Sequence, residues 1–529
     1  LGLFTNYGEI GAKSRTEWRA FAVDAFLQDS WKVKSNLTVE GGLRYIYWPP
    51  WHAKLNNIAM FDPEFYNPAA AATIDRKTGA ILGGDRFNGI VLPGNGFPSD
   101  ATGKIEAAGN PAYQRLFHGL PEGFSETHPF VFEPRLGMAY QINNKTVLRL
   151  GGGIFHQRVL LNDSTLLGGN PPIQFKVGVT NGVVDQPTGA TNATFPFIMT
   201  MQDPVFKHPT AYDWSASFQR ELPLQMVADV SYVGRMGLHL PRERNINQLQ
   251  PGTTFANPGV APDSLRPFLG FGAIRLSENS GRSIYHGLQV NLERRFSHGL
   301  GFGVAYTLST YDDSGYWSVS NNDRTHVFNV HYIYELPLWR KQDTLAGKLL
   351  GGWQVSGVTY FQSGAPLSVW RGDDYAGVGD TTAQPWDLVG DPTVSNPQFS
   401  QGRTVDQNFW FNPAAFKRPA NGTFGNAGRN PDGLRSPSFQ NWDIALFKNF
   451  PLGGSRRMQF RLEAFNFINH PNLGNPAGGS PYGVVIDPGS ADFGRVLTKT
   501  SERNVQLGVR PPLQPPSHVA ALRAPPCST

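Results

Sequence analysis

Apolar and polar residues alternate over short segments of the chain, which is the pattern of β-strands with one apolar face. In residues 36–48, Leu37, Val39, Leu43 and Tyr45 fall in one phase, and polar or charged residues fill much of the other. Successive side chains of a strand point to opposite faces, so this alternation predicts one face toward an apolar phase and one toward a polar phase.

The alternation recurs in pairs of segments, most of them joined by short turns. The expected pairs are 18–31 with 36–48, 132–142 with 146–155, 212–218 with 226–232, 284–296 with 300–308, 325–336 with 353–361, 442–446 with 458–464, and 493–498 with 505–509. The pair 325–336 and 353–361 has a somewhat longer connection than the others. The pattern predicts about fourteen strands in seven hairpins.

Long connections rich in Gly, Pro, Asn and Asp separate the hairpins. They are residues 49–131, 157–210, 236–283, 311–323 and 371–439. Long loops without structure are uncommon in compact domains, whereas short turns at one end and long loops at the other are typical of outer-membrane barrels. A closed barrel also pairs its backbone amides without water. The sequence therefore predicts an all-β fold, an antiparallel transmembrane β-barrel with long extracellular loops.

The composition agrees with strands and turns. Gly and Pro, the two worst residues for a helix interior, number 59 and 42 among 529 residues. No run of eighteen apolar residues occurs, so transmembrane helices are not expected. The formal charge of +5 is small and the basic residues are scattered, which argues against nucleic-acid binding. The single cysteine, Cys527, excludes an intrachain disulfide.

Aromatic residues gather near the ends of the expected strands. They are Trp31, Tyr45, Tyr47, Trp214, Tyr332, Trp353 and Trp442. Amphipathic rings are favoured at the level of lipid headgroups, so we expect these residues to form interfacial girdles. The alternative is that they are ordinary core aromatics of a soluble β protein.

Charged residues occupy the polar phase of the same strands. They are Asp24, Arg44, Arg149, Asp229, Glu293, Arg295, Arg461 and Glu463. In a wide barrel these side chains face the lumen, where they are expected to contact a plug domain or a passing substrate. The alternative is that they are only solvated, because any wide barrel needs a polar lumen.

Evidence for catalysis or metal binding is sparse. The chain has no nucleophile elbow, P-loop or His-Glu-x-x-His motif, so we expect no enzymatic activity and no cofactor. Asp373, Asp374 and Asp380 are a weak calcium candidate, because carboxylate oxygens suit calcium but their spacing matches no EF-hand loop. Histidines at 52, 118, 128, 156 and 208 lack ligand spacing.

Several phrases occur in the order found in a known family. They lie at residues 26–31, 37–45, 134–137, 146–153, 214–223, 230–234, 292–296, 350–357, 422–430, 441–450 and 461–471. In these phrases the chain resembles the barrel of TonB-dependent receptors of the Oar-like group, common in Acidobacteria. The resemblance implies a barrel of twenty-two strands, an N-terminal plug in its lumen and a TonB box that reaches the periplasm.

The resemblance also suggests how the chain is divided. We expect residues 1–17 to be a partial strand or loop and residues 18–510 to be a barrel portion whose plug lies outside this sequence. Pro511 and Pro512 interrupt the final expected strand, because proline cannot donate to a strand ladder. Residues 511–529 are therefore expected to be a disordered or aberrant tail.

The resulting hypothesis is an outer-membrane receptor for a large nutrient such as a saccharide, a peptide or a metal chelate. Its partners would be outer-membrane lipid and, through the plug, TonB. Two alternatives stay open, a barrel for adhesion or surface assembly without transport, and a self-contained passive porin.

Overall fold

The structure is a computed structural model. It describes residues 3–10, 15–159, 166–183, 196–313, 318–339, 341–380, 384–397, 408–452, 457–474, 483–500 and 502–510. No helix in these ranges has both the length and the apolar composition needed to cross a bilayer.

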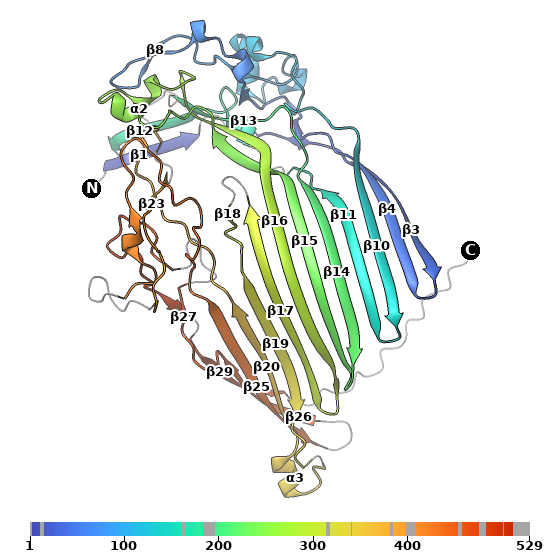
Figure 1. The fold of residues 1–529 in the computed structure, drawn as a ribbon. Helices are drawn as coiled ribbons and strands as arrows, with labels where there is room; N and C mark the ends of the chain where they lie inside the picture. Colours follow the sequence, from blue (N-terminus) through green and yellow to red (C-terminus); the bar gives the residue numbers. More distant parts are fainter. Residues whose placement is uncertain are drawn as a thin grey trace.

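One large antiparallel sheet dominates the fold (Figure 1). Its strands follow the order β29 (Asn504–Arg510), β26 (Arg457–Phe465), β25 (Phe439–Pro451), β20 (Trp353–Gln362), β19 (His326–Glu335), β17 (Leu300–Asp313), β16 (Phe271–Ser297), β15 (Met226–Asn245), β14 (Thr210–Leu222), β11 (Thr146–His156), β10 (Val131–Asn143), β4 (Leu37–Tyr47) and β3 (Val23–Lys34). Two further strands join it: β13 (Phe197–Gln202) runs parallel to β16, and β18 (Ser318–Val319) pairs with β17.

Small elements lie in the connections. The two-stranded pairs are β1 (Leu3–Ile10) with β12 (Lys176–Val183), β2 (Trp18–Arg19) with β5 (His52–Ala53), β6 (Met60–Phe61) with β9 (Ile90–Val91), β7 (Thr73–Ile74) with β8 (Ile81–Gly83), β21 (Trp370–Arg371) with β22 (Gln384–Pro385), β23 (Asp387–Leu388) with β24 (Phe416–Lys417), and β27 (Asn472–Leu473) with β28 (Lys499–Thr500). The α-helices in the described ranges are α2 (Thr253–Ala256) and α3 (Leu345–Leu350). Short 3-10 helices occupy Pro63–Phe65, Pro68–Ala70, Ser99–Ala101, Glu106–Gly109, Pro111–Leu116, Leu166–Gly169, Pro262–Ser264 and Pro413–Ala415.

Six of the seven expected hairpins are confirmed. Their turns carry the residues that tight turns need: His298 and Gly299, between β16 and β17, have φ angles of 53° and 83°. A two-residue turn with both φ angles positive matches the twist of the flanking strands, which is why glycine suits the second position. All the short turns lie at one end of the sheet, and the long loops gather at the other (Figure 1).

The prediction of the seventh hairpin was wrong. Residues 505–509 lie within β29, but β29 pairs with β26 and not with residues 493–498. Phe493 and Val496 are instead buried in a hydrophobic cluster of the loops. The sequence pattern misled here because a packed loop buries alternate apolar residues just as a strand does.

The first expected strand also begins later than predicted. β3 starts at Val23, while Trp18 belongs to β2 and packs against a loop core beside β5. In the described residues thirteen strands therefore follow one another along the sheet, against about fourteen expected. Residues 511–529 lie outside the described part of the chain.

Cross-strand register divides the sheet into two faces. Directly opposed residues of antiparallel strands share a face. One such row is Leu150, Ala216, Tyr232, Leu288 and Leu308, and the neighbouring row on the other side is Arg149, Ser217, Ser231, Gln289 and Thr307. We call these the apolar face and the polar face. Leu136, Leu288 and Leu462 on the apolar face are exposed, so this face has no protein cover in the described chain.

The buried apolar clusters of the described residues lie in the loops and at the loop end of the sheet. One cluster gathers apolar side chains from the loops between β4 and β16, including Phe61, Leu92, Met199 and Phe271. A second cluster, around Phe411, packs residues from 367 to 496. The long loops therefore form an ordered layer at one end of the sheet (Figure 1).

Two strands carry this loop layer beyond the main sheet. About 9–11 residues suffice for a strand to cross a bilayer, whereas β15 has 20 residues and β16 has 27. The extra residues lie at the loop end, where β13 adds to β16 and brings Met199 and Met201 into the first core. The sheet and the loop layer are thus one continuous structure.

The two edge strands of the sheet differ from the others. Within the described residues β3 pairs only with β4, and β29 pairs only with β26. Both strands are exposed along almost their whole length. In Figure 1 the sheet is a curved wall, open between these two edges.

Candidate functional site

The polar face is the candidate functional surface, because it gathers the charged residues singled out in the sequence. Register places Arg149 opposite Ser217, Asp229 opposite Gln219, and Glu293 opposite Val227. The same alternation of side chains along each strand places five further residues on this face: Asp24, Arg44, Arg295, Arg461 and Glu463. The predicted alternation therefore places all eight residues on one side of the wall.

These residues do not converge on one point but form separate local contacts along the sheet. Arg44 lies 3.0 Å from Asp24, and Arg149 donates to Gln219 Oε1 at 2.8 Å. Asp229 accepts hydrogen bonds from Ser217 and Ser231. At the far edge, Gln506 donates to Glu463 at 2.6 Å. The polar face is therefore a wide surface of separate polar contacts.

Glu133 is a buried charge that the sequence analysis missed. Its side chain is 2% exposed, and Arg44 and Arg135 lie 3.5 and 3.3 Å from it. The backbone N–H of His156 donates to its Oε1 at 2.6 Å. Two guanidinium groups and an amide compensate a carboxylate that would otherwise be costly to bury. The alternation Phe132-Glu133-Pro134 held the signal, since it puts Glu133 in the polar phase.

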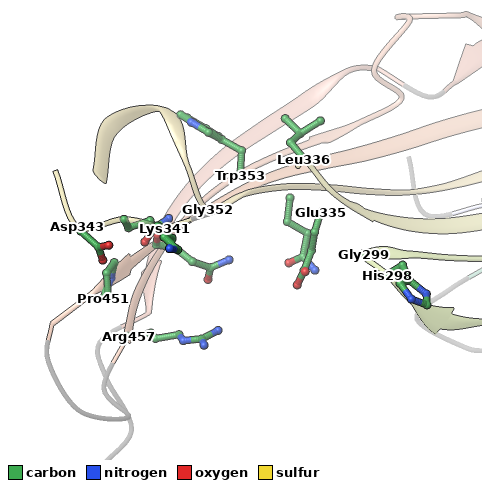
Figure 2. A pocket seen from close by; sticks show the side chains of 13 residues that line it. His298, Gly299, Glu335, Leu336, Lys341, Asp343, Gly352, Trp353, Pro451 and Arg457 are labelled. Atoms are coloured by element: carbon green, nitrogen blue, oxygen red, sulfur yellow. The ribbon is translucent and has the colours of Figure 1, made fainter. Parts of the chain in front are cut away.

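A cavity of about 520 Å³ opens at the end of the sheet that carries the short turns. Figure 2 shows its lining: Glu335, Lys341, Asp343 and Arg457 project to one side, and Trp353 and Leu336 to the other. Glu335 lies on the polar face opposite Gln354, so the cavity belongs to that face. Acidic and basic groups mix in this cavity, and the sequence pattern could not predict it because the lining comes from three separate turns.

At the loop end, three histidines come together that the sequence left apart. His208 lies beside His128, with ring centroids 6.4 Å apart, and against Trp48. Burial, with the nearby charges of His128, His156 and Arg158, lowers the pKa of His208 to about 4. The cavity lined by Trp48, His128, Arg158 and His208 is only about 20 Å³, so the side chains pack closely where the loops meet the sheet.

The aspartates proposed for calcium serve other contacts. Asp374 accepts the backbone N–H groups of Val378 and Gly379 at 2.9 and 2.8 Å, and Asp373 pairs with Arg371 at 2.6 Å. Within the described residues no group of three or more potential ligands is placed to hold a metal. The calcium site stays a prediction without geometric support.

Comparison with known proteins identifies the family. The chain matches the family model "Outer membrane beta barrel domain" over residues 1–506. The chain belongs to this family of outer-membrane β-barrel domains. The protein therefore resides in the outer membrane, and the exposed apolar face of its sheet faces lipid. By the same rule, the short turns mark the periplasmic end and the loop layer the extracellular end.

Solved structures with a similar chain path are distant in sequence. The FrpB iron transporter from Neisseria meningitidis (F5-1 variant) is 12% identical, with 93% of this chain and 46% of that chain covered and a TM-score of 0.41. The outer membrane transporter YddB from Escherichia coli is 10% identical, with 93% and 54% covered and a TM-score of 0.41. The copper transporter OprC is 8% identical, with 93% and 48% covered and a TM-score of 0.41.

The barrel protein spans about half the length of these three solved chains. No curated protein sequence matches it.

The aromatic residues expected at the membrane interface all lie on the lipid-facing side of the barrel protein. Trp31, Tyr332 and Trp353 lie toward the periplasmic turns. At the loop end are Tyr45, Tyr47, Trp214 and Trp442. This is the placement that two girdles require, although their contact with lipid headgroups stays a prediction.

Proposed function

We propose that the chain forms the barrel wall of a TonB-dependent receptor that takes up a large nutrient. The observation that carries the proposal is the polar face, on which charged and hydrogen-bonding side chains extend from β3 to β29. A small passive pore needs only a narrow polar lining, whereas a wide charged surface suits a lumen that holds a folded plug and admits bulky solutes. The likeness to the Oar-like receptors supports the same role.

On this proposal the wall and the loops have different tasks. The ordered extracellular layer captures the nutrient, which is a saccharide, a peptide or a metal chelate. The plug lies against the polar face, where Arg149, Glu293 and Arg461 contact it or the passing solute. TonB acts on the plug from the periplasm and couples uptake to the proton gradient. On this proposal the protein acts in transport and not in catalysis.

The edges of the sheet weigh against a self-contained porin. A closed barrel pairs its first and last strands, since unpaired backbone groups are costly in lipid. Within the described residues β3 and β29 each have one neighbour. We therefore favour the receptor, in which further strands stand between these two edges.

Uptake by the producing bacterium tests the proposal. Cells that carry or lack the gene are compared for growth on oligosaccharides, oligopeptides or ferric chelates as the sole source of carbon, nitrogen or iron. The expected result is a growth defect on one class, and loss of uptake when an uncoupler dissipates the proton gradient. Uptake that survives the uncoupler would indicate a passive porin, and lost surface attachment with normal uptake would indicate an adhesion barrel.

A pair of variants then tests the polar face. Replacing both Arg149 and Glu293 with Ala should lower uptake several-fold while the amount of protein in the outer membrane is unchanged. Gln289→Ala, an uncharged change on the same face, is the control. Equal uptake by all three strains would show that the charges of the polar face do not take part.

A further inference from the structure

The connection between β19 and β20 is the one short-side turn in the described chain that contains a helix. It holds α3, which begins after Thr344, whose side chain accepts the N–H of Gly347 at 3.0 Å. The apolar residues of this turn are exposed: Leu345 by 76%, Leu349 by 56% and Trp339 by 52%. An exposed apolar helix at the end of a membrane protein calls for a partner.

Two hydrogen bonds fix the side of the wall on which α3 lies. The indole N–H of Trp353 donates to the carbonyl of Leu349 at 3.1 Å, and Lys448 Nζ donates to the carbonyl of Gly351. Register places Trp353 and Lys448 directly opposite each other on the apolar, lipid-facing side. The C-terminal end of α3 is therefore bonded to residues of the lipid-facing side. In Figure 1 the helix lies at the end of the sheet that carries the short turns, which is the periplasmic end.

The opposite side of the same turn is polar. Lys341 and Asp343 line the cavity on the lumen side, away from Trp353 and Leu336 (Figure 2). The turn therefore straddles the rim, with its polar residues toward the lumen and the end of its helix toward lipid. Leu345 and Leu349 are four residues apart and share one side of the helix, because side chains at that spacing align.

We propose that α3 is an interfacial anchor that inserts Leu345 and Leu349 into the periplasmic leaflet of the outer membrane. The occupant of its apolar side is phospholipid, because the end of α3 is hydrogen-bonded to Trp353 and Lys448 on the lipid-facing side of the sheet. Lys348 is exposed between the two leucines and is suited to pair with a phosphate headgroup. The inference needs only membership of the outer-membrane family and not the transport function.

Lys448 gives a reason for a helix at this position. Its side chain is 4% exposed on a face that meets lipid, between the rings of Trp353 and Phe450 at 5.4 and 4.7 Å. A cation at such a place needs acceptors, and the carbonyl end of a helix supplies them. A helix that served only this purpose would have no need of leucines on its exposed side. The experiment must separate these two roles.

Site-directed fluorescence in isolated outer membranes provides the test. In a Cys527→Ser background, Leu345→Cys and Leu349→Cys are labelled with an environment-sensitive dye. Phospholipids spin-labelled near the headgroup, and aqueous iodide, are then used as quenchers. Leu82→Cys, at a leucine that is 68% exposed in the extracellular loops, is the matched control. All these positions are exposed, so the variants should fold.

The anchor predicts at least a several-fold stronger lipid quenching at residues 345 and 349 than at residue 82, together with protection from iodide. Iodide quenching equal to that at residue 82 would overturn the proposal and leave α3 as a cap on Lys448 alone. Protection from both quenchers would also overturn it, since a periplasmic protein would then cover the helix.

Discussion

Arg435 Nη2 lies 2.7 Å from Asp323 Oδ2, and this ion pair ties the loop before β25 to the loop before β19. Asp323 is 2% exposed and also accepts the N–H of Tyr311 at 3.0 Å. Arg435 donates in addition to the carbonyl of Gly364 at 3.0 Å. Beside it, Arg429 pairs with Asp313. The extracellular layer is thus clamped to the strands by charges, in addition to its apolar cores.

The ion pair between Arg435 and Asp323 should stabilise the loops more than the sheet. Asp323→Ala removes the acceptor of Tyr311 N–H and of Arg435 Nη2. The expected cost is about 2–3 kcal/mol, less than for a fully buried pair because Arg435 is partly exposed and keeps its bond to the carbonyl of Gly364. We expect faster proteolysis of residues 363–438 in outer membranes, with the sheet intact. Asp432→Ala, at an exposed aspartate of the same loop, is the control. Equal cleavage of both variants would contradict this role of the ion pair.

We expect a new charge to be tolerated on the polar face of the sheet and not on the apolar face. Leu288 and Gln289 are neighbours on β16, and both are exposed, but they lie on the apolar and the polar face. Leu288→Arg should cost about 2–4 kcal/mol because the guanidinium meets lipid, whereas Gln289→Arg should be tolerated. The free energy of unfolding in lipid, from denaturant titration, measures both. A reversed order would show that the faces have been assigned the wrong way round.

The close packing of Trp214 requires glycine at position 234. A Cβ at Gly234 would lie 2.1 Å from Cε2 of Trp214, which packs across it from the neighbouring strand. Gly234→Ala should therefore destabilise the barrel by about 1–3 kcal/mol through overpacking. Adding Trp214→Ala to this variant should recover part of the loss. Gly41→Ala, where a Cβ meets nothing within 4 Å, is the control, and an equal loss there would refute the explanation.

Asp374 predicts how the loop between β20 and β25 responds to metal removal. Its two oxygens hold the N–H groups of Val378 and Gly379, so the carboxylate organises the turn without an ion. Asp374→Asn keeps one acceptor and should loosen the turn by about 1–2 kcal/mol. Asp373→Asn should have little effect. Limited proteolysis of the wild type should not change with EDTA, and an EDTA-dependent change would restore the calcium hypothesis.

The lowered pKa of His208 predicts that the packing between the loops and the sheet weakens in acid. Its folded pKa of about 4 lies below the ordinary value of 6.5, mainly because the ring is partly buried. Protonation of His208 therefore favours local unfolding where the loops meet the sheet. The contribution of the neutral ring to stability is complete above about pH 6.5 and is lost as the pH falls toward 4. Hydrogen exchange of residues 203–209 should rise over this range beyond the intrinsic effect of pH.

Substitution of the histidine checks the source of that sensitivity. His208→Phe should remove most of the pH dependence, because the ring that resists protonation is gone. His118→Phe, at an exposed histidine stacked on Phe65, should keep it. A pH dependence that persisted in His208→Phe would show that His208 is not its source.

Local pattern alone determined the wall. Strand side chains alternate with a period of two, so Leu288 and Gln289 had to lie on opposite faces once the segment was a strand. The pattern also placed the short turns and the long loops, and it put Arg149, Glu293 and the other candidate residues on one face. These features depend on neighbours in the chain, which is why six of seven hairpins could be predicted.

Only the tertiary structure decided what the loops do. The burial of Phe493, the pairing of Arg435 with Asp323 across more than a hundred residues, and the gathering of His128, His156 and His208 all need contacts between distant segments. The attachment of the end of α3 to the lipid-facing side depends likewise on Trp353 and Lys448 from two strands. A periodic pattern specifies the direction of each side chain, but the partners it meets are set by how the chain folds back on itself.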